Sequence, residues 1–247
     1  MNNPEYVWLF GMLLLVVAAL YASVGHGGAS GYLALMALFG FSPVLMKSSS
    51  LLLNIFVSFI AFWQYFRGGY FRWNLFVPFA IASVPAAFLG SWISVDAVIY
   101  KQILGALLIF PVLRLLGLFG KEKEKLKAVN LPAALLIGTI IGVLSGMIGI
   151  GGGIILSPLI LLFGWGTMKE TAAVSALFIF VNSLSGFGGL ISKGIQIDPL
   201  VWLWLGIAIT GGFAGAYLGR KMLNNIVLKR VLAFVLVIAS IKLLTVK

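Results

Sequence analysis

The sequence contains no cysteine, a single histidine and only six acidic residues among its 247. Without cysteine, disulfides, thiolate metal sites and cysteine nucleophiles are all excluded. Nucleophilic, acid–base or metal-assisted catalysis needs paired polar groups or a cluster of ligands within one site. The carboxylates instead lie at the ends of hydrophobic segments or between them, at Glu5, Asp96, Glu122, Glu124, Glu170 and Asp198. We therefore expect no enzyme, no catalytic residues, no metal site and no cofactor.

Charge of either sign is scarce as well. Charged residues make up 9% of the chain and hydrophobic residues 62%, with a mean hydropathy of +1.13. Soluble domains carry about 25% charged residues, so this composition indicates an integral membrane protein. A helix needs about 20 apolar residues to cross the hydrocarbon core. Charge-free runs of about this length or longer cover residues 7–46, 48–66, 73–95, 131–168, 171–192 and 199–219.

These runs are too long for barrel strands and lack their alternation, so we predict that every span is an α-helix. Two shorter runs, 102–113 and 231–241, are flanked by Lys or Arg. They cross the bilayer only if those cations extend to the interface. No Lys or Arg precedes the first run, so we expect residues 7–24 to be retained and not cleaved as a signal. The net charge of +11 is explained by cations in loops between spans and does not indicate nucleic-acid binding.

The chain also repeats itself. The stretch GHGG at 25–28 aligns with GIGG at 149–152 at an offset of 124, and the Phe-Gly pair at 39–40 aligns with that at 163–164. After a one-residue insertion the offset becomes 125. It then aligns Ser50 with Ser175, Ser58 with Ser183, Gly69 with Gly194, Phe88 with Phe213 and Gly90 with Gly215. A spacing shared over this distance predicts two halves of one fold.

We predict a first transmembrane repeat at 1–118, a charged linker at 119–129 and a second repeat at 130–247. Each half has a helical hairpin broken at its glycines, followed by three transmembrane helices. Because the hairpin returns the chain to the side it left, each half crosses an odd number of times. The predicted fold is thus an all-α integral membrane protein of two inverted-topology repeats.

The cations give this fold an orientation. Twelve Lys or Arg fall on the side of the linker and five on the other side. The positive-inside rule therefore places the linker in the cytoplasm and both termini on the outer, periplasmic side of the cell inner membrane.

The glycine clusters interrupt helices at membrane depth, where unpaired backbone survives only inside protein or beside a water-filled cavity. Each cluster is followed by a half-helix, at 32–40 and at 154–164. A helix N-terminus offers partial positive charge and free N–H groups, and glycine lets an anion's oxygens approach them. The predicted anion-binding glycines are Gly25, Gly27, Gly28, Gly149, Gly151, Gly152 and Gly153. In contrast, we interpret Gly211, Gly212, Gly215 and Gly219 as helix-packing positions.

Neutral polar side chains on the following spans are candidates to complete the anion site. These are Ser48, Ser49, Ser50 and Asn54 in the first half, with Ser175, Asn182 and Ser183 in the second. Hydrogen bonding between helices is their alternative role. His26 is either a protonatable contact to the anion or a neutral plug of the break. Lys47 and Lys169, near the start of a span, either attract anions or extend to the interface.

The motif GIGGGIILSPLILLFG at 149–164, followed by AAVSALFIFVNS at 172–183, resembles the sulfite exporter TauE/SafE family of membrane permeases. The resemblance extends over nearly the whole chain. It implies a transporter of sulfur-containing anions such as sulfite, sulfonates or sulfoacetate, with both glycine motifs near the pathway.

The sequence thus favours a secondary transporter that binds a small anion near the midplane and works by alternating access in the lipid bilayer. An anion channel is the alternative, followed by a non-transporting membrane scaffold. The residues leave open the direction, the oligomeric state and the coupling ion, for which a proton is one candidate.

Overall fold

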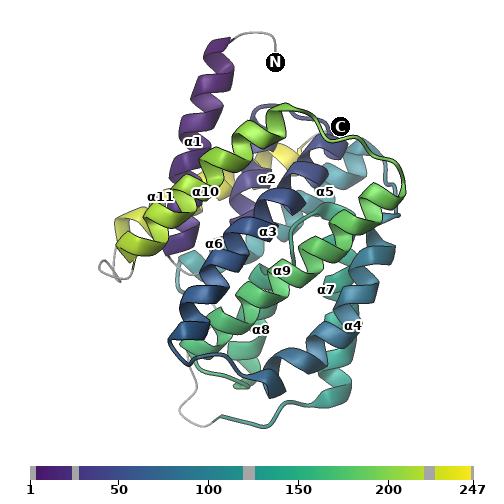
Figure 1. Cartoon of the computed structure of the whole chain (residues 1–247), viewed down its shortest axis with the longest axis vertical. Helices are drawn as coiled ribbons and strands as arrows, with labels where there is room; N and C mark the ends of the chain where they lie inside the picture. The colour runs from purple at the N-terminus through teal and green to yellow at the C-terminus, as the bar shows by residue number, and fades with distance from the viewer. Residues whose placement is uncertain (1–3, 24–27, 119–125, 220–225, 246–247) are drawn as a thin grey trace.

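The computed structural model describes residues 4–23, 28–118, 126–219 and 226–245, and all regular elements in these ranges are α-helices (Figure 1). In chain order they are α1 (Pro4–Ser23), α2 (Ala29–Leu38), α3 (Pro43–Arg67), α4 (Trp73–Ser91), α5 (Ala97–Leu107), α6 (Ile109–Leu115), α7 (Leu131–Ile148), α8 (Gly153–Phe163), α9 (Met168–Ser192), α10 (Leu200–Gly219) and α11 (Ile226–Leu244).

Four of these helices, α3, α4, α7 and α9, are long and apolar enough to cross a membrane within the described part of the chain. Shorter apolar stretches lie in α1, α2, α5 to α6, α8 and α10. Large apolar side chains also face outward, including Trp8, Ile81 and Leu136, which are 69%, 65% and 63% exposed. Lipid accommodates such a surface and water does not. The prediction of an all-helical membrane protein is confirmed.

The two shorter hydrophobic runs fold differently from each other. The run at 102–113 is divided between α5 and α6, which are separated at Leu108. The run at 231–241 lies inside one continuous helix, α11.

Each glycine cluster joins a longer helix to a shorter one that turns back. Near the start of α1, the Phe10 ring packs against those of Phe39 and Phe41 beyond α2, with ring centres 5.3 and 5.1 Å apart. In the second half, the Lys127 amide before α7 donates to the Gly164 carbonyl after α8 over 2.7 Å. Both hairpins, α1–α2 and α7–α8, therefore return the chain to the side from which it came.

Contacts at the helix ends define two faces of the bundle. The linker face holds residues 126–130, the turn at 68–72 and the start of α9, where Lys169 Nζ donates to Tyr70 Oη over 3.1 Å. The terminal face holds the ends of α2, α4, α9 and α11, where Lys242 Nζ donates to Leu38 O over 2.8 Å. Because α3 ends and α9 begins at the linker face, these two packed helices run antiparallel through the molecule (Figure 1).

Two further helix pairs, α1 with α10 and α4 with α7, are joined by close backbone contact. A Cβ added to Gly90 would lie 2.4 Å from Val143 O, and one added to Gly215 would lie 2.0 Å from Ala19 O. Gly90 and Gly215 are related by the offset of 125 in the sequence repeat, and Ala19 and Val143 by the offset of 124. These two contacts follow the register of the repeat.

We expect Gly215→Val to destabilise the protein, because the added Cβ cannot avoid the α1 backbone. Overpacking of this kind costs about 1–3 kcal/mol or more. Gly212 also packs against another helix, α3, but it has room for a Cβ, which would lie at an ordinary contact distance of 3.4 Å from Val57 Cγ1. The melting temperature in detergent should fall by several degrees for Gly215→Val and remain near the original for Gly212→Ala. Equal melting temperatures would contradict the packing geometry.

Candidate functional site

The second glycine cluster forms a helix break with left-handed backbone at three positions. Helix α7 ends at Ile148, and Gly149 caps it with φ +88° and an N–H bonded to Ser145 O. Gly151 and Gly152 have φ of +72° and +75°, and α8 begins at Gly153. Residues with a Cβ rarely adopt these angles, so the glycines are required by the backbone. The predicted interruption is present, although Gly153 belongs to α8 and not to the break.

The break lies between α3 of the first half and α9 of the second. Ser50 Oγ, from α3, donates to the Gly149 carbonyl over 2.9 Å. Further in, a Cβ on Gly151 would lie 3.2 Å from both Asn54 Nδ2 of α3 and Ser183 Oγ of α9. Polar side chains from both halves of the chain thus adjoin the break, alongside the apolar side chains of Ile141, Phe178 and Ile179.

Several of these polar atoms have no hydrogen-bond partner among the described residues. Both amide atoms of Asn54 and the hydroxyls of Ser145, Ser175 and Ser183 are in this state, and all four residues are fully buried. Ser145 lies beside Gly152, because a Cβ there would be 3.6 Å from Ser145 Cβ. Similarly, a Cβ added to Gly153 would lie 2.7 Å from the backbone oxygen of Ser175. Buried polar groups are usually paired, so a cluster of unpaired ones around one break requires an explanation.

The backbone of α8 adds further donors to this cluster. The N–H groups in the first turn of a helix have no carbonyl of the same helix to bond to. In α8, the N–H groups of Ile155 and Leu156 are the first to find one, since both donate to Gly152 O. The N–H groups of Gly153 and Ile154, which precede them, point toward the break. The positive end of the helix dipole lies there as well. No side chain caps this end, since its N-cap residue is Gly152. The arrangement presents neutral donors and partial positive charge, which is suited to an anion.

The first break is described only in part, because Gly25, His26 and Gly27 lie outside the described residues. Helix α1 ends at Ser23, and Gly28 caps α2 with φ +78°. Aromatic side chains surround this end: a Cβ on Gly28 would lie 2.5 Å from Tyr32 Oη, and Tyr21 Oη is 2.6 Å from Ser30 Oγ. Tyrosine side chains thus adjoin the described part of the first break, whereas serine and asparagine side chains adjoin the second.

The predicted polar residues have different roles in the structure. Ser50 bonds to a carbonyl of the break, while Ser48 bonds to Val44 O and Leu45 O within its own helix. Asn182 Nδ2 donates to Phe178 O, and neither Asn182 Oδ1 nor the buried Ser49 hydroxyl has a hydrogen-bond partner among the described residues.

Sequence reasoning misses Ser145, a small polar residue one turn before Gly149. A signal for it exists, because it opens the motif SGMIGIGGG.

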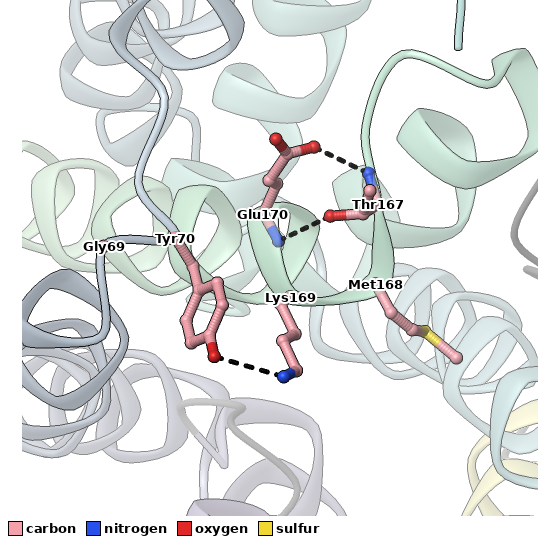
Figure 2. Close-up of a pocket in the computed structure, with 6 residues that line it drawn as sticks. All are labelled: Gly69, Tyr70, Thr167, Met168, Lys169 and Glu170. Carbon is pink, nitrogen blue, oxygen red and sulfur yellow. Dashed lines mark hydrogen bonds between the residues drawn. The ribbon is translucent and has the colours of Figure 1, made fainter. Parts of the chain in front are cut away.

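A separate cavity of about 360 Å³ at the linker face is lined by Gly69, Tyr70 and residues 167–170 (Figure 2), and none of these belongs to the break. Lys169 extends toward Tyr70, with Nζ 4.7 Å from the ring centre, while Glu170 and Thr167 form a reciprocal capping box. Arg72 pairs with Glu170 at 3.3 Å. These contacts join the turn after α3 to the start of α9, so the cavity lies where the two halves meet at this face.

The model of the family Sulfite exporter TauE/SafE matches residues 9–243. The probable membrane transporter protein y4hK of Sinorhizobium fredii is 36% identical over 233 residues, which cover 93% of this chain and 94% of that protein. The probable membrane transporter protein YdhB of Bacillus subtilis is 26% identical over 245 residues, with 94% and 98% covered. No solved structure matches the chain significantly.

Proposed function

This chain belongs to the sulfite exporter TauE/SafE family of membrane transporters, and we propose that it is a secondary transporter of small anions. The transported anions are sulfur-containing, of the sulfite, sulfonate or sulfoacetate type. The observation that carries this proposal is the cluster of buried, unpaired polar groups around the second glycine break. The protein acts as a carrier and not as an enzyme.

An anion supplies acceptors for the donors among these groups. Asn54 Nδ2 and the hydroxyls of Ser145 and Ser183 donate to its oxygens, together with the N–H groups at the start of α8. Hydrogen bonds to charged groups contribute about 1.5–3 kcal/mol each, enough to replace part of the anion's hydration shell. None of the polar side chains that adjoin this break in the structure is a carboxylate, so a bound anion meets no like charge.

Transport then requires the two halves to move relative to each other, because the site is buried from both faces. Helices α3 and α9 are equivalent in the sequence repeat and run antiparallel, which supports the inverted topology. If the two halves were related by a rotation axis along the membrane normal, equivalent helices would run parallel. An inverted pair of halves provides two related conformations, each open to one face. A buried site favours such a carrier over a channel, which needs a continuous pore.

We place the linker face in the cytoplasm. Arg67, Arg72, Lys127 and Lys169 lie at this face, and further Lys and Arg residues follow in the linker sequence. The positive-inside rule supports this orientation for the cell inner membrane, with the terminal face outside.

Reconstitution into liposomes tests the proposed function. Vesicles loaded with unlabelled sulfite should accumulate radiolabelled sulfite by counterflow, and methanesulfonate should compete more strongly than chloride. Flux without counterflow would indicate a channel. Absence of flux for all three anions would refute the proposal and leave a non-transporting role.

A further inference from the structure

Lys47 is a buried cation that has no acidic partner among the residues that the structure describes. It lies in the second turn of α3, is 8% exposed, and its Nζ donates to Ser91 O at the end of α4 over 2.8 Å. Within the described ranges, the single ion pair joins Arg72 to Glu170 at the opposite face. A buried charge is expensive unless an opposite charge accompanies it. The negative end of the α4 dipole offsets only a part of this cost.

The position of Lys47 connects it to the second glycine break. A Cβ added to Gly149 would lie 3.0 Å from Lys47 Cα and 3.4 Å from Lys47 Cγ, so the lysine stem covers this glycine. Ser50 bonds to the carbonyl of the same glycine, and Asn54 adjoins Gly151. Spacings of three and four residues place these three side chains on one face of α3. The face thus presents a cation, a hydroxyl and an amide in order from the terminal face inward.

The repeat-equivalent face of α9 lacks this cation. At the offset of 125, Lys47 corresponds to Ala172, Ser50 to Ser175 and Asn54 to Ile179. Only the serine is kept. The lysine is therefore specific to the α3 face, which adjoins the break where the unpaired polar groups lie.

We propose that Lys47 is the cation that attracts and holds the transported anion on the terminal-face side of the second break. This inference rests on the proposed function and deepens it: the site selects substrates by negative charge, and it does so through one residue of the first half. Lys193 Nζ donates to Trp92 O, next to the Ser91 carbonyl that Lys47 contacts, and adds a second cation at the terminal face.

A structural role for Lys47 makes a different prediction. If it only caps the carbonyl end of α4, then any donor of similar length should replace it. Lys47→Gln keeps a donor and removes the charge, Lys47→Arg keeps the charge, and Lys47→Met removes both while keeping the length. Lys242→Gln is the matched control, because Lys242 Nζ also donates to a helix-end carbonyl at the terminal face, that of Leu38.

The experiment measures sulfite counterflow into proteoliposomes and the melting temperature in detergent for each variant. Lys47→Gln should raise the KM for sulfite about tenfold with little change in melting temperature, whereas Lys47→Arg should stay within about threefold of the unaltered protein. Lys242→Gln should leave KM unchanged. Lys47→Met replaces Lys47→Gln if the latter does not fold, since apolar replacement of a buried charge is often tolerated.

An unchanged KM in Lys47→Gln, or an equal increase in Lys242→Gln, would overturn the inference while the proposed function stands. A loss of melting temperature that fully accounts for the lost flux would assign Lys47 to the capping role and overturn it as well. If the unaltered protein carries no sulfite, methanesulfonate or chloride, the proposed function fails first and this inference with it.

Discussion

Replacement of Gly152 by valine should abolish anion transport while the protein still inserts into the membrane. Gly152 has φ +75°, and an added Cβ would lie 2.5 Å from Ile141 Cγ2 and 3.0 Å from Phe178 Cε1. A β-branched residue resists this backbone angle at a cost of about 1–3 kcal/mol. The side chain would also cover the N–H groups with which α8 begins. The surrounding spans keep their hydrophobicity, so insertion should be unaffected.

Two variants separate loss of the site from general strain. Gly194 has φ +74° with no atom within 4 Å of an added Cβ, so Gly194→Val imposes the same backbone strain on an exposed turn. It should transport normally. Gly215→Val imposes crowding between helices and should lower the melting temperature more than it lowers the flux per folded molecule. If Gly152→Val keeps its sulfite flux, or loses flux only in proportion to the amount of folded protein, the glycine break has only a structural role. The proposed anion site is then wrong.

Much of the fold could be predicted from the sequence, because in lipid the length and polarity of a segment restrict its structure strongly. Charge-free runs located the spans, and consecutive glycines located the interruption at 149–152. The repeat offset even related Gly90 to Gly215, two residues that prove to be in equivalent contacts. The boundary between α5 and α6 at Leu108 was not predicted, although Pro111 marks it: proline lacks the N–H that would bond to Leu107 O in a continuous helix.

The site was less predictable, because its parts are distant in sequence. Asn54 and Ser183 both adjoin Gly151, although 97 and 32 residues separate them from it along the chain. Composition suggested that such residues complete a site, but not which of them face a break. Ser48 and Ser50 illustrate the difference: one bonds within its own helix, and the other reaches the break of the opposite half. Helix packing decides such roles, and one sequence does not encode them locally.

Asn54→Leu should raise the stability of the protein and reduce its transport. The Asn54 amide is fully buried, and neither of its polar atoms has a partner among the described residues. An unsatisfied buried polar group costs about 1–3 kcal/mol, and leucine of similar size removes that cost. The melting temperature in detergent should therefore rise by a few degrees. Because the amide donates to the anion, its loss also removes about 1.5–3 kcal/mol of binding, roughly tenfold to a hundredfold in the apparent affinity for sulfite.

Ser83→Ala is the matched control for this trade of stability against function. The Ser83 hydroxyl is also fully buried and has no partner within the described ranges, but Ser83 lies on α4 against Gly142 of α7, two helical turns before the break. Its removal should raise or preserve the melting temperature and leave sulfite counterflow unchanged. Reduced flux in Asn54→Leu together with normal flux in Ser83→Ala would separate a functional unpaired group from a merely tolerated one. If Asn54→Leu gains stability and transports sulfite with unaltered KM, the amide is not part of the anion site, and the donors at this break are reduced to the serines and the α8 backbone.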